Sequence, residues 1–220
     1  MKKDSIFLKL YQVVLAVVTW FALGVQLKLM LDNAPGLEIS TGVTILNYLS
    51  FFTILTNLLV AASLTAVSFM PSSAGGIFFR KPGSVSAIAV YISIVGIVYS
   101  IALRKIWDPQ GWQLIADRLL HDVVPVLYVV FWWLAVPKKT LQWKSFLLWL
   151  IYPLTYLIYA IVRGIFTGWY AYPFLDVKKI GWGMVALNVM VITSAFCLVS
   201  LLFIFINRKF LVRSNGRPLQ

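Results

Sequence analysis

A threonine and the only histidine of the sequence are the residues best suited to chemistry, because both lie within long apolar stretches. Thr53 belongs to LNYLSFFTILTNLL and His121 to RLLHDVVP. Counted from the outer ends of their expected helices, both lie about 10 residues deep, or about 12–15 Å at the helical rise. A hydroxyl becomes a good nucleophile when a base takes its proton, and histidine changes protonation closest to neutral pH. The two residues therefore predict a Thr–His catalytic dyad.

A polar stripe surrounds Thr53 on its expected helix. Ser50, Thr53 and Asn57 lie within about 60° of one another at 100° per residue, with Asn47 and Thr56 at the edges of the stripe. Asn57 or Ser50 could donate a hydrogen bond to an oxyanion, and Thr56 is an alternative nucleophile. Such stripes are also typical of helix packing, because Ser, Thr and Asn often form hydrogen bonds across helices. Both interpretations stay open at this point.

Ionisable residues crowd around His121 at the start of its helix. Asp117 precedes it by four residues and shares its helical face, so the carboxylate could orient the imidazole. Arg118 and Asp122 have the spacing of an i, i+4 ion pair. Arg118, or Arg163 at the outer end of a later helix, is a candidate for binding a substrate carboxylate. The alternative is a solvated patch at the membrane surface, with His121 extending toward the headgroups.

Two further residues bear on this site. Pro125 follows His121 by four positions and lacks a backbone donor, which favours a kink or a widened gap in the helix. Cys197 is the only cysteine and lies in the last apolar run, so neither an intramolecular disulfide nor a cysteine cluster for a metal is possible. No metal and no cofactor are expected.

The elements that must position these residues are membrane helices, because the chain is too apolar for a water-soluble core of its size. Of its 220 residues 61% are hydrophobic, and the apolar runs have the length of about 20 residues that crosses a bilayer as a helix. We therefore expect an all-α, polytopic membrane protein in which residues 1–220 form a single transmembrane domain. Six transmembrane helices are predicted, at residues 5–31, 43–69, 86–103, 114–136, 143–163 and 181–207.

The distribution of charge predicts that both termini lie on the cytoplasmic side. With the N-terminus inside, twelve of the 19 Lys and Arg residues fall at inner helix ends, as the positive-inside rule favours. All acidic residues except Asp4 then lie on the outer side. The net charge of +12 is spread over helix ends rather than gathered in one basic stripe, so nucleic acid is not an expected partner.

Three segments carry a resemblance to a known family. FFTILTNLL, RLLHDVVP and GWYAYPFLD occur in this order on the predicted six-helix chain, and the pattern resembles the androgen-induced-gene family of membrane proteins and its bacterial relatives. The resemblance spans about residues 47–176 and fits best at Gly168 and at residues 172–175. Animal members are threonine hydrolases that cleave fatty acid esters of hydroxy fatty acids with one intramembrane Thr and one His.

Carried over by motif, the resemblance implies Thr53 as the nucleophile and His121 as its histidine. The spacing from Thr53 to Asn57 differs by one residue from the animal motif, which keeps Thr56 as an alternative. The resemblance to the bacterial relatives of this family implies that the protein lies in the bacterial cytoplasmic membrane. Because the outer loops are the more varied ones, we expect the site to open toward the outer side.

The leading prediction is an intramembrane hydrolase of lipid (fatty acyl) esters, with membrane lipids and an amphiphilic ester substrate as partners. The first alternative is a transporter or lipid-binding protein, in which the polar stripe lines a pathway and His121 relays protons with Asp117. The second is a structural or regulatory membrane partner, for which packing alone explains the polar residues. The sequence predicts no oligomeric state.

Overall fold

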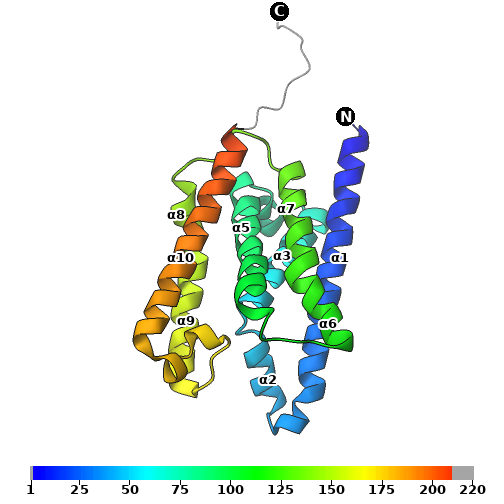
Figure 1. The fold of residues 1–220 in the computed structure, drawn as a ribbon. Coiled ribbons are helices and arrows are strands. Elements are labelled where there is room, and N and C mark those ends of the chain that lie inside the picture. The colour runs from blue at the N-terminus through cyan, green and yellow to red at the C-terminus, as the bar shows by residue number, and fades with distance from the viewer. Residues whose placement is uncertain (1, 210–220) are drawn as a thin grey trace, which may run out of the picture.

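The computed structural model describes residues 2–209, and this part of the chain is built from helices without a strand (Figure 1). Two π-helical turns and two 3-10 turns accompany the α-helices. The π-helical turns are η2 (Tyr99–Leu103) and η3 (Leu119–Val123), and the 3-10 turns are η1 (Pro35–Leu37) and η4 (Pro173–Leu175). The α-helices are α1 (Lys2–Asn33), α2 (Thr41–Tyr48), α3 (Phe52–Phe69), α4 (Ala74–Phe79), α5 (Pro82–Val98), α6 (Gly111–Arg118), α7 (Val124–Ala135), α8 (Ser145–Trp149), α9 (Ile151–Thr167) and α10 (Val177–Lys209).

The long helices run up and down a single bundle, so that the start of α1 and the end of α10 lie at the same end of it (Figure 1). Helix α1 packs against α3, α6 and α7, while α5 contacts α3, α7 and α10. Helices α8 and α9 lie on the flank of the bundle beside α10. The loops after α1, α5 and α9 gather at the opposite end from the two ends of the described chain.

Within residues 2–209, five helical segments are long and apolar enough to cross a membrane, and they confirm the prediction of an all-α integral membrane protein. They are residues 6–33, 52–69, 82–103, 145–167 and 177–209. The sixth predicted helix, 114–136, is also helical, as α6, η3 and α7, but it is not among these five. Its first half carries three charged residues within six positions, Asp117, Arg118 and Asp122. None of the five segments contains three charged residues so close together.

The outer surface of the bundle is apolar, as a lipid environment requires. On α9 and α10, large apolar side chains such as Ile158, Phe166 and Leu198 point away from the core. Inside, the packing is rich in aromatic groups, and the buried Trp132 donates a hydrogen bond to the Ser86 hydroxyl at 2.8 Å. Satisfying the indole N–H in this way permits a large side chain to be buried without loss of a hydrogen bond.

The predicted second helix, 43–69, is divided in the structure, which corrects the prediction of one continuous element. Helix α2 ends at Tyr48, residues 49–51 form a turn, and α3 begins at Phe52. As a result Thr53 occupies the first turn of a membrane helix instead of the middle of one. This change decides the surroundings of the proposed nucleophile.

Long-range hydrogen bonds stabilise this break. The local sequence therefore contains no residue pattern that predicts it. Tyr156 of α9 donates to the Ser50 carbonyl at 2.8 Å, and the hydroxyls of Ser50 and Tyr159 lie 2.8 Å apart. The Ser50 hydroxyl also donates to the Leu46 carbonyl of α2. The Leu46 and Ser50 carbonyl groups, which the break leaves without helical donors, are thereby satisfied.

The remaining predicted helices keep their places with shifted ends. Helix α5 begins earlier than predicted, and the segment 143–163 is divided at Leu150 into α8 and α9, which continues to Thr167. Helix α10 begins at Val177 and contains a kink at Gly181, whose φ of 74° favours glycine. Residues 210–220 of the predicted single domain lie outside the described residues.

Candidate active site

A cavity of about 580 Å³ inside the helical bundle contains both members of the predicted dyad. Its walls come from α1, α2, the start of α3, η2, α6, η3 and the loop after α9, and Thr53 and His121 both line it. The volume lies in the range of about 300–1,000 Å³ that is usual for small-molecule sites. Two residues from helices distant in sequence therefore line one cavity.

Thr53 lies at the N-terminal end of α3, where the backbone N–H groups have no helical acceptor. Its N–H donates to the Tyr172 hydroxyl oxygen at 3.3 Å, and its own hydroxyl oxygen lies 3.4 Å from the same phenol. Burial raises the pKa of the Tyr172 phenol, although hydrogen bonds with Thr53 and with the backbone of Phe52 lower it. The phenol therefore stays protonated at neutral pH and can donate as well as accept.

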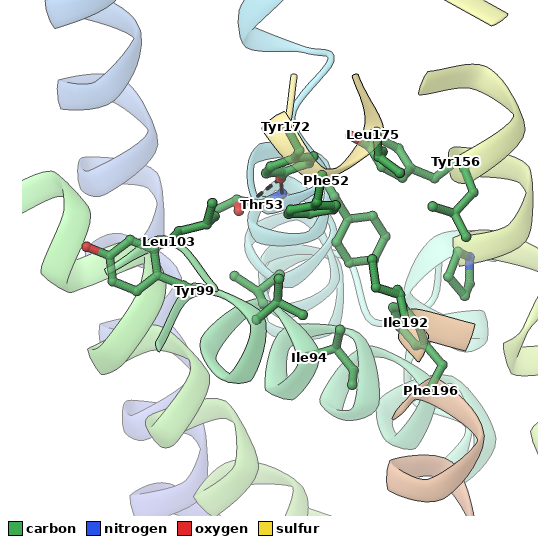
Figure 2. A pocket seen from close by; sticks show the side chains of 15 residues that line it. Phe52, Thr53, Ile94, Tyr99, Leu103, Tyr156, Tyr172, Leu175, Ile192 and Phe196 are labelled. Carbon is green, nitrogen blue, oxygen red and sulfur yellow. Dashed lines mark hydrogen bonds between the residues drawn. The ribbon is translucent and has the colours of Figure 1, made fainter. Parts of the chain in front are cut away.

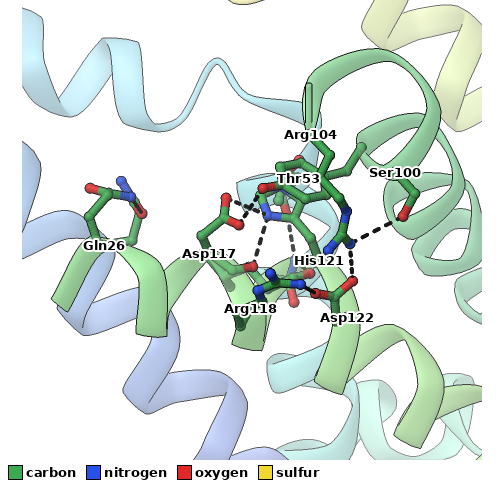
Figure 3. A network of polar contacts seen from close by, with 12 residues as sticks. Gln26, Thr53, Ser100, Arg104, Asp117, Arg118, His121 and Asp122 are labelled. Atoms are coloured by element: carbon green, nitrogen blue, oxygen red, sulfur yellow. Dashed lines mark hydrogen bonds and ion pairs between the residues drawn. The ribbon is translucent and has the colours of Figure 1, made fainter. Parts of the chain in front are cut away.

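His121 is fixed through one ring nitrogen. Its Nδ1 lies 3.0 Å from the Asp117 carbonyl and 3.2 Å from an Asp117 carboxylate oxygen, so it must carry a hydrogen (Figure 3). Tyr99 stacks on the imidazole with ring centroids 3.9 Å apart and donates a hydrogen bond to the Asp117 carboxylate. A neutral imidazole held in this way keeps its lone pair on Nε2. The predicted orienting role of Asp117 agrees with this geometry.

A second set of ion pairs lies beside this group, nearer the surface. Asp122 is bound by Arg104 of the segment after η2 and by Arg118, the latter at 3.1 Å (Figure 3). The Arg104 guanidinium also lies over the Tyr99 ring, 5.0 Å from its centroid. The hydrogen bond with Asp122 raises the pKa of Arg104, so the guanidinium stays charged. These contacts brace Tyr99 against His121.

The two π-helical turns explain how these side chains meet. Turn η2 carries Tyr99 and turn η3 carries His121, and such turns often occur at functional sites. In η3 the Val124 N–H donates to the Leu119 carbonyl. The next carbonyl, that of Leu120, would accept from residue 125 in the same pattern, but Pro125 has no N–H group. The irregularity that Pro125 predicts is therefore present one turn before it.

Asn57 satisfies the carbonyl group that this irregularity frees. Its Nδ2 donates to the Leu120 carbonyl at 3.3 Å and to the Thr53 carbonyl at 2.8 Å. The side chain is fully buried and does not line the cavity. Asn57 therefore ties the turn that carries Thr53 to the turn that carries His121, a placement that does not fit the predicted oxyanion role.

The other predicted residues lie as follows. Ser50 holds the helix break and does not line the cavity, so it does not fit the oxyanion role either. Thr56 is fully buried, forms a 3.2 Å hydrogen bond with Tyr152 and also lies away from the cavity. Of the two candidate nucleophiles, Thr53 and Thr56, only Thr53 is therefore open to a ligand. Arg118 has a side chain that is 55% exposed and paired with Asp122, away from the cavity wall.

Arg163 acts on the cavity from behind its wall. It donates to the Asn47 side-chain oxygen at 2.7 Å, and its guanidinium lies 4.4 Å from the Trp169 ring centroid. Asn47 and Trp169 line the cavity, but Arg163 does not. Because the arginine can only donate, it fixes the orientation of the Asn47 amide and leaves the NH₂ group for a ligand.

Two tyrosines that were not predicted from the sequence, Tyr99 and Tyr172, complete the site. Tyr99 has no sequence spacing that relates it to His121, because the two belong to different helices. Tyr172 lies in the GWYAYPFLD segment on which the resemblance rests, so that motif could have identified it. Among residues 2–209, no three His, Cys, Asp or Glu side chains lie close enough together to hold a metal ion.

Comparison with known proteins identifies no family for this chain. No family model matches the sequence, no curated protein is similar to it, and no solved structure matches its fold. The resemblance to the androgen-induced-gene family therefore stays a prediction from motifs.

Proposed function

We propose that this chain is an intramembrane hydrolase of amphiphilic, lipid-type esters, with Thr53 as the nucleophile and His121 as the general base. The observation that carries the proposal is that both residues line one cavity of about 580 Å³, with the His121 Nδ1 side occupied by Asp117. That arrangement provides a hydroxyl, a base with a free Nε2, and a carboxylate that orients the base. Water and the ester are the only other reactants.

The reaction proceeds in two steps. In the first, the Thr53 oxygen attacks the acyl carbon while His121 Nε2 takes the hydroxyl proton and then gives it to the leaving alcohol. In the second, His121 takes a proton from water as the water oxygen attacks the acyl-threonine. His121 then returns that proton to the Thr53 oxygen as its bond to the acyl carbon breaks, which releases the carboxylic acid and restores the free hydroxyl. Asp117 and Tyr99 keep the imidazole in place through both steps.

Two donors at Thr53 serve the oxyanion. The Thr53 N–H lies at the positive end of the α3 dipole, and the Tyr172 phenol is hydrogen-bonded to the same residue. In the free protein the phenol oxygen accepts from this N–H. A substrate carbonyl oxygen takes over that acceptor position, and the phenol then donates to it. This assignment replaces the predicted roles of Asn57 and Ser50.

For the membrane, we propose that α6, η3 and α7 form a sixth span and that both termini are cytoplasmic. The alternation of helix directions and the common end of α1 and α10 support this topology (Figure 1). Leu37, Trp107 and Trp169 line the cavity, and they lie in the loops at the end of the bundle away from the two ends of the described chain. In this topology the site opens on the outer side of the membrane, which for a bacterial protein is the cytoplasmic membrane.

Hydrolysis of lipid-type esters by the purified protein in nanodiscs tests the function. We expect turnover by the parent and by Thr56→Ala, with at least about a 100-fold loss in Thr53→Ala and His121→Ala. Equal turnover by parent and Thr53→Ala would exclude Thr53 as the nucleophile.

The apolar character of most of the cavity wall also favours a lipid-binding protein without catalysis. In that case the folded parent binds a fluorescent amphiphile but cleaves no ester, and Thr53→Ala leaves the dissociation constant unchanged. Binding together with Thr53-dependent turnover excludes this second function.

A further inference from the structure

Thr53 lies where two cavities of very different size meet. Besides the large cavity, a second one of about 50 Å³ lies between the start of α3, α5, α9 and α10 (Figure 2). Thr53, Tyr99, Leu103 and Tyr172 line both spaces. The proposed nucleophile therefore has room on two sides, as an ester needs for its acyl part and its alcohol part.

The two spaces offer different chemistry. Apart from Thr53 and three phenols, the small cavity is lined by apolar side chains, among them Ile94, Leu175 and Ile192 (Figure 2). The large cavity contains Asp117 and His121 together with several amide side chains. An unsubstituted hydrocarbon group fits the small cavity, whereas a group with polar substituents fits the large one.

The position of His121 decides which part of the ester enters which cavity. The group that returns the proton must reach the leaving alcohol oxygen. His121 lines the large cavity and not the small one. The alcohol therefore lies in the large cavity, and the acyl chain extends from the carbon bonded to Thr53 into the small one.

The size of the small cavity limits the acyl chain. Its volume of about 50 Å³ is less than a tenth of that of the large cavity, so it takes only a few atoms of a substrate. We propose that the substrates are esters of a short acyl group, about two to four carbons long, with a large amphiphilic alcohol. This inference rests on the proposed hydrolase function and narrows its substrate class.

Amide groups in the large cavity indicate that the alcohol carries oxygen atoms. Arg163 holds the Asn47 oxygen, which leaves the Asn47 NH₂ to donate to a ligand. Gln113 donates to the Gln26 oxygen at 2.7 Å, and both line the cavity, so a Gln26 NH₂ and a Gln113 oxygen are left over. Hydroxyl, ether or carboxylate oxygens on the alcohol match these groups.

The balanced reaction is a deacylation. The bond from Thr53 Oγ1 to the acyl carbon forms as the carbon–oxygen bond to the alcohol breaks, and the alcohol leaves with the proton that His121 carried. Water then cleaves the acyl-threonine, so the products are a short carboxylic acid and the free alcohol.

A series of 4-methylumbelliferyl esters from acetate to palmitate, presented in mixed micelles to the full-length protein, tests the inference with one constant bulky alcohol. We expect kcat/KM to be highest for the acetate-to-butyrate esters and at least tenfold lower from the octanoate onward. An optimum at the octanoate or longer overturns the short-acyl assignment but leaves the hydrolase function standing. No turnover of any ester by folded protein overturns the function and this inference together.

Two matched variants test which cavity takes the acyl chain. Ile192 lines only the small cavity of the two, and Ile39 lines only the large one. Ile192→Ala therefore enlarges the small cavity, and Ile39→Ala enlarges the large one by the same change of side chain. We expect Ile192→Ala to move the optimum to acyl chains at least two carbons longer and Ile39→Ala to leave it unchanged. A shift in Ile39→Ala alone, or no shift in either variant, contradicts the assignment.

Discussion

The hydroxyl of Thr53 and the imidazole of His121 depend on side chains that do not themselves touch the cavity. Asn57 is the clearest example, because its amide donates to the carbonyls of Thr53 and of Leu120, the residue before His121. Both bonds are buried, and the Leu120 carbonyl has Pro125 where its π-helical donor would be. We therefore expect Asn57 to be a positioning residue that sets the distance between the proposed nucleophile and the proposed base.

Replacing Asn57 by Leu tests this positioning role. We expect a lower melting temperature, from a loss of about 1–3 kcal/mol in unfolding free energy, and a fall in kcat of about tenfold or more with little change in KM. The measurements are thermal unfolding in detergent and steady-state ester hydrolysis.

Asn207 provides the matched control at the other end of the bundle. It is fully buried, donates to the Pro137 carbonyl and accepts from Thr140 and Leu141. Asn207→Leu should lower the melting temperature while leaving kcat within about twofold. If both variants lose kcat in proportion to stability, Asn57 is only a structural residue.

The residue types of the site could be predicted from sequence, but their partners could not. A lone histidine with Asp117 one turn before it is a local pattern, and the structure keeps it. The role of Tyr172 depends on a contact across 119 positions, and that of Tyr99 on the meeting of two helices. Asn57 has the right helical face, but its donors are used by backbone carbonyls, which periodicity cannot reveal.

At the scale of the elements, the site depends on the close approach of α5 to turn η3. Gly96 of α5 permits it, because a Cβ atom there would lie 3.1 Å from the His121 carbonyl oxygen and 3.4 Å from the Pro125 Cβ. The first neighbour belongs to η3 and the second to the first turn of α7, which directly follows it. A small residue is therefore needed at this position for the stacking of Tyr99 on His121.

The variant Gly96→Ala tests this approach. We expect the added methyl group to push η3 away from α5 and to lower kcat about tenfold, with a small loss of thermal stability. Gly83→Ala, on the same helix with nothing within 4 Å of the added Cβ, should keep parental activity. Parental activity in Gly96→Ala would show that the approach of these elements does not control catalysis.

Helix patterns predicted most elements, and the exceptions have a common cause. Runs of apolar residues located the long helices, and Pro125 marked the irregular turn. The break at residues 49–51 contains neither proline nor glycine, and hydrogen bonds from Tyr156 and Tyr159 of α9 stabilise it. Elements that end because of tertiary contacts cannot be delimited from local sequence.

For the whole molecule, the central question is whether α6, η3 and α7 cross the membrane. This segment carries the base of the proposed dyad, and its two ends adjoin the loops at residues 104–110 and 136–144. A crossing places those loops on opposite sides. The amphipathic start of the segment then faces the interior of the bundle, where Asp117 and His121 are paired.

Cysteine accessibility in intact cells tests this topology. In a Cys197→Ser background, we expect Asp108→Cys to react with a membrane-impermeant maleimide and Lys144→Cys to react only after permeabilisation. Both positions are exposed in the structure, so access depends on the side of the membrane. Labelling of both cysteine variants without permeabilisation would show that α6, η3 and α7 do not cross the membrane.

The most direct test of the central claim is labelling with a fluorophosphonate probe of the detergent-purified protein, followed by mass spectrometry of the modified peptide. We predict one adduct on Thr53 in the parent and in Thr56→Ala, and its loss in Thr53→Ala and in His121→Ala, all confirmed as folded by thermal unfolding. Absence of any adduct on the folded parent, or an adduct that persists in His121→Ala, would contradict a nucleophilic Thr53 activated by His121.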